Sequence, residues 1–279
     1  MTIEGNCKIN LSLNIEGILP NGYHSIRTIF QELSLSDRIS MEFGESGVSL
    51  TCDKAGVPTD EKNIAYRAAL LFYDAAGISD GVHIHIEKNI PSEAGLGGGS
   101  ADGGAVLKGM NEHYGYPLSA EKLIELGAML GADVPFFIMG GTALATGIGE
   151  VLTPLKSKIK TDVLIVKPSV GVSTPWAYKT LDEEGFTPAD VDKTLLAIEK
   201  GDLDLLCSSM GNVFEQVVEK TYPQISHIKN QMLSLGARGS MMSGSGTAVF
   251  GIFDNADALN NAYDYFRNEY KETFKAKMI

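Results

Sequence analysis

The clearest chemical signal in the sequence is a run of glycines between residues 95 and 104. Six of these residues are glycine: Gly95, Gly97, Gly98, Gly99, Gly103 and Gly104. The whole chain of 279 residues holds 31 glycines, whereas average usage of about 7% predicts roughly 20. The run follows a predicted strand over residues 82–88. It precedes a predicted helix that begins with Ser100 as its N-cap and ends near His113.

This arrangement favours an anion-binding loop over residues 91–100. Glycines let backbone N–H groups turn toward a ligand and approach it closely. The N-terminus of the following helix adds positive potential. A mobile loop is the other interpretation, but such loops usually contain Ser, Asn and Asp among their glycines. We therefore expect the segment to bind phosphate.

Three common nucleotide-binding motifs do not describe this loop. A P-loop needs a Gly-Lys pair, and the chain contains none. The dinucleotide fingerprint G-x-G-x-x-G fails because Ser100 stands where the last glycine would follow Gly95 and Gly97. The H-R-D and D-F-G motifs of protein kinases are also missing from the sequence.

The segment from Pro91 to Asp102 resembles the nucleotide loop of the galactose, homoserine, mevalonate and phosphomevalonate kinase superfamily. The triple glycine is similar to the form found in its branch that acts on a cytidine diphosphate-linked methylerythritol. Further segments agree with that branch: Lys8-Ile-Asn10-Leu, Gly22-Tyr23-His24, Leu130-Gly-Ala-Asp133-Val-Pro135-Phe-Phe and Ser243-Gly-Ser-Gly-Thr247. Together they cover nearly the whole chain, in order.

The resemblance implies a two-domain α+β small-molecule kinase with its active site in the cleft between the domains. The implied reaction is ATP-dependent phosphorylation of the 2-hydroxyl of the cytidine diphosphate-linked methylerythritol, in non-mevalonate isoprenoid biosynthesis. Two alternatives stay open. One is another small-molecule kinase of the superfamily, and the other is a nucleotide-binding regulator without turnover. Mg²⁺ is expected because it neutralises the triphosphate, but no ligands for it are identifiable.

The resemblance assigns catalysis to Asp133 and Lys8. Asp133 is implied to be the general base that takes the proton of the acceptor hydroxyl. Without the resemblance, a capping or turn aspartate would be the simpler interpretation. Lys8 is implied to keep Asp133 ionised and to neutralise the transferring phosphoryl group. By itself, Lys8 would be interpreted as a solvated lysine on the polar face of the first strand.

The acceptor substrate is expected to contact four other residues. The resemblance places Asn10 at this substrate, and Tyr23 with His24 at the cytidine ring. Tyr178 corresponds to an aromatic residue on the other face of that ring. A buried tyrosine and a surface histidine are the alternatives for Tyr23 and His24.

The ATP contacts carried over from the resemblance are Asn63, Lys88, Pro91, Ala94, Gly95, Leu96, Gly97, Gly98, Gly99, Ser100 and Ala101. Asn63 is alternatively a helix cap, and Lys88 a solvated charge. The chain departs from the family pattern at Glu93, which is expected to point outward, and at Ala101-Asp102-Gly103-Gly104. Helical Gly103 and Gly104 would each cost about 1 kcal/mol relative to alanine. The turn over residues 243–247 is either a simple hairpin or part of the site.

The elements that must position these residues are predicted from periodicity. Residues 7–15 alternate between apolar and polar, which predicts a strand with one solvated or functional face. Further strands are expected within 38–52, at 142–146 and 161–167, and within 237–253. Helices are expected over 63–76, 119–129, 187–199, 211–219 and 223–234, and from Ala256 onward. Because no regular βαβ repeat is present, the pattern predicts an α+β fold.

Composition and charge exclude several classes of protein. The 23 basic and 35 acidic residues give a net charge of −12, which argues against nucleic acid or an anionic membrane as a partner. Three scattered cysteines, Cys7, Cys52 and Cys207, are typical of a reducing cytoplasm. A His83–His85 pair lacks an evident third metal ligand, so no metal site is predicted. The division expected is a nucleotide-binding and catalytic domain over 1–155 and a second domain over 156–279.

Overall fold

The computed structural model describes residues 1–44 and 46–279, which divide into two compact units. Unit 1 comprises residues 1–7, 36–90 and 97–140, and unit 2 comprises 8–35, 91–96 and 141–279. Both units are therefore discontinuous in sequence, and the division into a nucleotide-binding domain over 1–155 and a second domain over 156–279 stays a prediction. The units are discontinuous because β1 (Thr2–Ile18) and β2 (His24–Phe43) are long neighbouring strands that each supply residues to both units.

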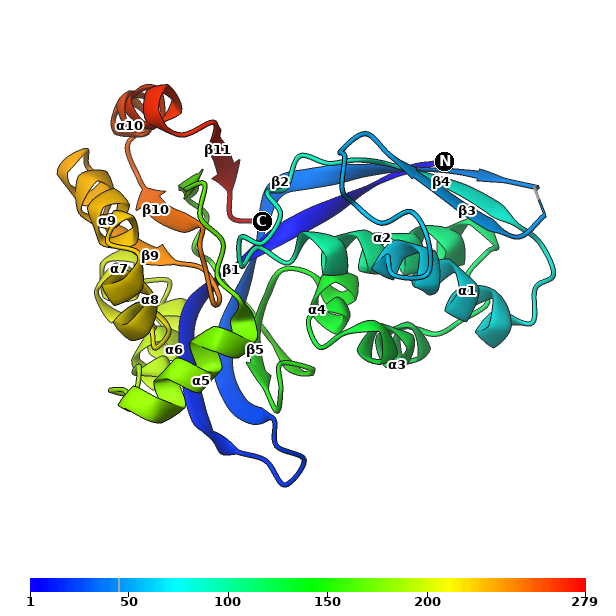
Figure 1. The fold of residues 1–279 in the computed structure, drawn as a ribbon, viewed down its shortest axis with the longest axis horizontal. Coiled ribbons are helices and arrows are strands. Elements are labelled where there is room, and N and C mark those ends of the chain that lie inside the picture. Colours follow the sequence, from blue (N-terminus) through cyan, green and yellow to red (C-terminus); the bar gives the residue numbers. More distant parts are fainter. Residues whose placement is uncertain (45) are drawn as a thin grey trace. The chain divides into compact units, whose positions relative to one another are not determined.

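Unit 1 packs helices against a sheet (Figure 1). In this sheet, β4 (Val82–Glu87) lies between β3 (Val48–Cys52), which is parallel to it, and the antiparallel residues 38–43 of β2. The helices are α1 (Ile64–Ala76), α2 (Gly98–His113), α3 (Ala120–Leu130) and α4 (Val134–Met139). Alternate residues of β4 are buried with the apolar faces of these helices. This packing determines where the start of α2 lies within the unit.

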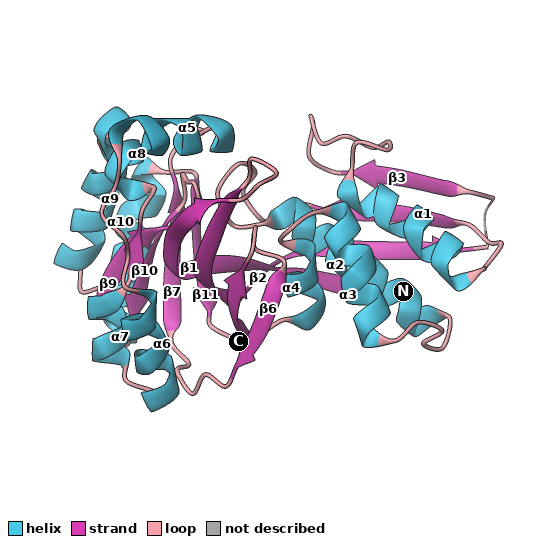
Figure 2. Cartoon of the chain, turned by 90° about the horizontal axis from the view of Figure 1, so that it is seen from below, coloured by secondary structure: helices cyan, strands magenta, loops and turns pink. Residues whose placement is uncertain are grey.

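Unit 2 contains a four-stranded sheet in the order β11-β7-β10-β9, all antiparallel. Its strands are β7 (Asp162–Lys167), β9 (Gly239–Met242), β10 (Val249–Phe253) and β11 (Glu272–Lys277). Figure 2 shows helices covering one face of this sheet. The helices of the unit are α5 (Thr174–Glu184), α6 (Val191–Lys200), α7 (Leu203–Ser209), α8 (Glu215–Thr221), α9 (Gln224–Ser234) and α10 (Ala256–Glu269).

The long strands also pair with short strands of unit 2. Residues 28–31 of β2 pair with β5 (Thr142–Thr146), and β5 pairs with β6 (Val151–Leu155). Residues 12 and 13 of β1 pair with β8 (Gly211–Asn212). The α+β class expected from the sequence is confirmed. In the part of the chain that the structure describes, no helix is both long and apolar enough to cross a membrane.

Candidate active site

The nucleotide-binding helix α2 begins two residues earlier than the sequence predicted. Gly97 is its N-cap, with φ of 74°, and the helix starts at Gly98. The expectation that Ser100 caps the helix is therefore wrong, because Ser100 lies within the first turn. The first N–H group that is hydrogen-bonded within the helix is that of Ala101, which donates to Gly97 O at 2.8 Å. The N–H groups of the preceding turn have no acceptor in the helix and are suited to an anion.

Gly103 and Gly104 allow α2 to pack closely against two other helices. A Cβ on Gly103 would lie 2.5 Å from Ile64 Cγ2 of α1, and a Cβ on Gly104 would lie 2.8 Å from Phe137 Cβ of α4. Their weak helix propensity is thus outweighed by packing. Gly103 and Gly104 depart from the family pattern, but because they pack closely they do not make the loop more flexible.

Asp133 is the residue immediately before α4, so the same packing connects it to α2. Asp133 occupies the N-cap position, is half-buried, and its carboxylate makes no capping hydrogen bond. The capping interpretation of Asp133 is therefore not supported, whereas Asp133 does lie in a turn, as the other alternative expected. Unit 1 holds the predicted base and the start of α2 in one packed set of helices.

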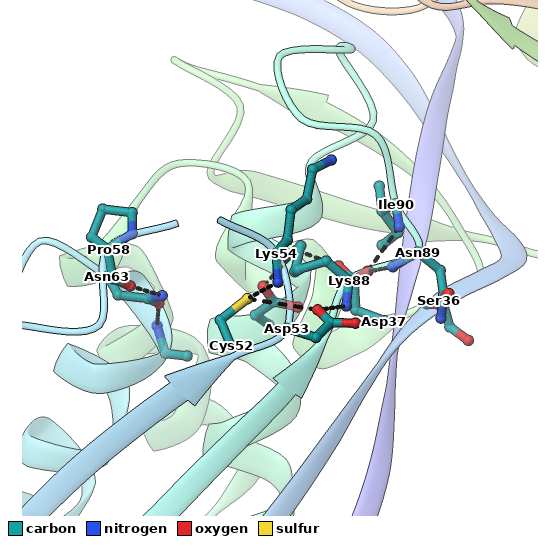
Figure 3. A network of polar contacts seen from close by, with 12 residues as sticks. Ser36, Asp37, Cys52, Asp53, Lys54, Pro58, Asn63, Lys88, Asn89 and Ile90 are labelled. Atoms are coloured by element: carbon teal, nitrogen blue, oxygen red, sulfur yellow. Dashed lines mark hydrogen bonds and ion pairs between the residues drawn. The ribbon is translucent and has the colours of Figure 1, made fainter. Parts of the chain in front are cut away.

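The two residues expected near adenosine already use their polar atoms within the protein. Asn63 caps α1, because Oδ1 accepts from Ala65 N at 2.9 Å and Nδ2 donates to Pro58 O at 2.7 Å. Lys88 is buried and forms ion pairs with Asp37 and Asp102. Figure 3 shows the Asn63 and Lys88 groups at separate places in unit 1. The alternative of a solvated Lys88 is wrong.

In unit 2, the first part of the glycine-rich loop is fixed by the 243–247 turn. Gly95 has φ of 74°, and a Cβ there would lie 2.0 Å from Ser243 O, so only glycine fits. Ser243 Oγ donates to Gly95 O at 3.0 Å, and Ala248 N donates to Ala94 O at 3.1 Å. The turn thus joins β9 to β10 and also supports the loop. Glu93 is exposed, as expected.

Lys8 and Asn10 lie in a buried polar row on β1. Lys8 is only 4% exposed. Its Nζ donates to Asn10 Oδ1 at 2.8 Å and lies 4.8 Å from the centre of the Phe30 ring. Asn10 Nδ2 donates to Thr28 Oγ1 at 2.8 Å. Of the two alternatives for the polar face of this strand, the solvated one is excluded, because Lys8, Asn10 and Ser12 are all buried, and the functional one stays a prediction.

The same strand is joined to the loop through the backbone. Lys8 N donates to Leu96 O at 3.0 Å. Unit 2 therefore places Lys8 and Asn10 next to the segment from Pro91 to Leu96. Lys8 and Asp133 belong to different units, so the pairing of the two stays a prediction.

The residues expected at the cytidine ring cluster near the end of β1 and the start of β2. His24 stacks on Tyr178 with ring centres 4.3 Å apart and an angle of 21°. Its Nε2 lies 2.9 Å from Asp182 Oδ1. Tyr23 is 61% exposed, which excludes a buried tyrosine. At 4.3 Å, no third ring fits between His24 and Tyr178. Tyr23 offers an accessible aromatic surface, and the contact of Tyr178 with the cytidine ring stays a prediction.

Sequence reasoning missed the residues that hold the predicted ones in place. They are Thr28, Phe30, Asp37, Asp182 and Asn212. For example, Asn212 Nδ2 donates to the carbonyls of Met242 and Gly244, which fixes the 243–247 turn. Each of these residues lies far along the sequence from the residue that it contacts, so the spacing of residues could not predict the contact. Alternate apolar residues on β2 could have found that strand, but not these contacts.

Two family descriptions match the chain. Residues 63–141 match the N-terminal domain of the GHMP kinases, and residues 194–272 match the C-terminal domain. The first range contains the start of α2, Asp133 and the Asn63 cap. The second contains the 243–247 turn.

Relatives that match over the full length of the chain indicate one branch of this family. The chain is 44% identical to 4-diphosphocytidyl-2-C-methyl-D-erythritol kinase of Acetivibrio thermocellus, covering 100% of this chain and 99% of that one. It is 46% identical to the protein of that name from Caldicellulosiruptor saccharolyticus, over 94% and 91% of the two chains. A crystal structure of 4-(cytidine 5'-diphospho)-2C-methyl-D-erythritol kinase matches with a TM-score of 0.86 and 34% identity, over 100% and 99%. The chain therefore belongs to the 4-diphosphocytidyl-2-C-methyl-D-erythritol kinase family of the GHMP kinases.

Proposed function

We propose that this chain transfers the terminal phosphoryl group of ATP to the 2-hydroxyl of 4-diphosphocytidyl-2-C-methyl-D-erythritol. The products are the 2-phosphate and ADP, and the step belongs to non-mevalonate isoprenoid precursor biosynthesis. The observation that supports this best is that the glycine-rich start of α2 and Asp133 lie on helices packed together through Gly104. Family membership supplies the acceptor.

Asp133 would act as the general base. Its carboxylate takes the proton from the 2-hydroxyl as that oxygen attacks the γ-phosphorus, and the bond between this phosphorus and the β,γ-bridging oxygen breaks. The pair of electrons from that bond leaves with ADP. Because phosphoryl transfer depends mainly on alignment and charge stabilisation, a carboxylate held by a packed helix suits this role.

Lys8 would neutralise charge on the transferring group. Its position is fixed by Asn10 and by the Phe30 ring, so the ammonium is held rigidly on β1. Burial means that this charge is little screened by solvent. Asn10, which Lys8 contacts, would bind the acceptor.

The cytidine ring would stack on Tyr23, and His24 would contact the ring edge. Tyr178 supports His24 from its other side through their stacked rings. Asp182 accepts a hydrogen bond from His24 Nε2, and this favours the tautomer that carries the proton on Nε2. Such a histidine offers Nδ1 as an acceptor to the base.

ATP would bind over the N-terminal turn of α2, where the triphosphate meets backbone N–H groups. Mg²⁺ would neutralise the triphosphate. Within residues 1–44 and 46–279, no group of three His, Cys, Asp or Glu side chains suits a metal ion.

A parallel assay of ADP release tests this function. The full chain is offered ATP with 4-diphosphocytidyl-2-C-methyl-D-erythritol, mevalonate, homoserine or galactose. Turnover with the cytidylyl acceptor alone is expected. Turnover with a different acceptor would identify another kinase of the superfamily, and ATP binding without any turnover would identify a regulator.

A further inference from the structure

Three ionisable side chains from separate elements of unit 1 meet in a buried cluster. Asp37 lies on β2, Lys88 follows β4, and Asp102 lies in the second turn of α2. Their side chains are 0%, 6% and 3% exposed, respectively. We call this group the Asp37–Lys88–Asp102 cluster, and Figure 3 shows the Asp37 and Lys88 part of it.

Asp37 fixes the backbone immediately before the glycine-rich loop. Its Oδ1 accepts from Asn89 N at 2.6 Å and from Ile90 N at 2.8 Å. Its Oδ2 forms an ion pair with Lys88 Nζ. Because Ile90 directly precedes Pro91, a single buried carboxylate holds the residues that lead into the loop.

Asp102 fixes the chain on the other side of the loop. Its Oδ2 accepts from Lys88 Nζ at 2.7 Å. A Cβ added to Gly98, the first residue of α2, would lie 3.1 Å from Ile90 Cγ2 and 3.5 Å from Lys88 Nζ. The residues before and after the loop are therefore both packed against the cluster.

The charge of the cluster depends on Asp102. Burial raises the pKa of Asp102 to about 7, with Lys88 opposing the shift and Asp37 adding to it. Burial alone would lower the pKa of Lys88, but the two carboxylates raise it above its usual value. Asp102 Oδ1 is buried and, among the described residues, makes no hydrogen bond. The cluster thus gains or loses a proton near neutral pH while Lys88 stays charged.

Other ionisable groups beside the cluster come from the end of β3. Asp53 Oδ1 accepts from Lys88 N at 2.9 Å, and Cys52 interacts electrostatically with Lys88 and Asp102. Burial raises the pKa of the Cys52 thiol, so Cys52 carries no charge at neutral pH. The Lys54 side chain extends away from Asp37 and Lys88 (Figure 3).

We propose that Asp37 and Asp102 are positioning residues for the nucleotide, because through Lys88 they fix both ends of the glycine-rich loop. Protonation of the cluster would then favour ATP. The inference rests on the proposed binding of ATP at α2. Lys88 is then a counter-ion within the protein and not a ligand of adenosine. A deprotonated cluster carries a net charge of about −1 beneath a helix turn that must bind a triphosphate, and like charges repel.

The first experiment measures proton uptake when the nucleotide binds. The full chain is titrated calorimetrically with a non-hydrolysable ATP analogue at pH 7.5, in buffers of different ionisation enthalpy. We expect the wild type to take up a fraction of a proton that Asp102→Asn does not. The γ-phosphate of the analogue titrates near pH 6 to 7 in both proteins, so its contribution cancels in the comparison. Equal proton uptake by the two proteins would overturn the inference.

The second experiment compares affinities and kinetics across variants. Between pH 6 and pH 8 the wild type should lose about fivefold more affinity for the analogue than Asp102→Asn does, since a shift of one pKa unit corresponds to a factor of ten. Asp102→Ala and Asp37→Asn should raise KM for ATP at every pH, with smaller effects on kcat and on KM for the acceptor. With Asp102→Asn, KM for ATP should be much closer to the wild-type value than with Asp102→Ala.

Glu87→Gln is the matched control, because Glu87 adjoins Lys88 in sequence but forms an exposed pair with Arg38. It should bind the analogue like the wild type. Folded Asp102→Ala and Asp37→Asn proteins with unchanged affinity would refute the positioning role. If the analogue binds as expected but the cytidylyl acceptor is not phosphorylated, the proposed function fails and this inference stands. If the wild type does not bind the analogue, both fail.

Discussion

Removing the carboxylate of Asp133 and removing the ammonium of Lys8 should change the free energy of unfolding by different amounts. Asn has nearly the size and shape of Asp, so Asp133→Asn should fold like the wild type while turnover falls about 100-fold to 10,000-fold, the range for a lost general base. Lys8→Ala should also abolish turnover. It should lower the free energy of unfolding by about 1–3 kcal/mol, because buried Asn10 Oδ1 loses its donor. Turnover assays and denaturant unfolding measure both, and near-normal turnover in either variant contradicts the assignment.

Tyr23 offers a residue-scale test of the cytidine site. Because the side chain is mostly exposed, Tyr23→Ala should leave stability unchanged. Loss of base stacking, about 1–3 kcal/mol, should raise KM for the cytidylyl substrate by about 5-fold to 150-fold, with little change in KM for ATP. Tyr116→Ala, at a similarly exposed tyrosine of unit 1, is the control. An equal rise in both KM values would exclude this role for Tyr23.

At the scale of elements, the glycines of α2 differ in whether a neighbouring helix leaves room for a side chain. Gly104→Ala should lower the free energy of unfolding by about 1–3 kcal/mol, because the new Cβ would overlap Phe137 of α4. Gly99→Ala places its Cβ no closer than 3.9 Å to Ile64 Cδ1. It should keep or raise stability by up to about 1 kcal/mol through better helix propensity. Chemical unfolding of the two variants measures this difference, and equal stabilities would show that α2 can move away from α4.

How well each element could be predicted depended on what it packs against. The helices α1, α3 and α9 have one apolar face and were predicted within a few residues, as was the start of α10. In contrast, β1 is buried on both faces over residues 7–13. Its alternating pattern allowed either a solvated or a functional polar face, and the pattern alone could not show that the face is buried. The strand β11 was missed because the predicted terminal helix was extended over it. Ser100 was a good capping residue by type, but a left-handed Gly97 begins the helix instead.

The candidate site was predictable where chemistry is local in sequence. The glycine-rich loop and the segment around Asp133 are each contiguous, so the sequence identified them. The contacts that position these segments join residues such as Asp37 and Lys88, which are about fifty positions apart. Such contacts depend on how β2 and β4 pair, which no spacing pattern encodes.

At the scale of the whole molecule, the buried Glu215 contributes to how stability changes with pH. Burial raises the pKa of Glu215 above the usual glutamate value, with Lys229 opposing the shift. Between its unfolded and folded pKa values, Glu215 binds a proton more readily in the folded than in the unfolded state, and this contribution to stability is lost as the pH rises through the folded pKa. We expect Glu215→Gln to gain stability relative to the wild type between pH 4 and neutrality.

Glu219→Gln is the control for this prediction, because Glu219 also pairs with Lys229 but is more exposed. Thermal unfolding at several pH values measures both variants. A stability difference between Glu215→Gln and the wild type that does not change with pH would show that Glu215 has an ordinary pKa in the folded protein.

The burial of Lys8 and Lys88 has a consequence for the rate at which substrates arrive. Neither cation projects into solvent, and the chain as a whole carries −12, so an approaching nucleotide meets a repulsive field at long range. Dissolved salt screens that field over about 8–10 Å but hardly weakens contacts inside the protein. Raising the ionic strength from about 0.01 M to 0.15 M should therefore increase kcat/KM for ATP, about twofold or more. Stopped-flow association of a fluorescent nucleotide would follow the same trend, and slower association in salt would indicate that exposed cations attract the nucleotide.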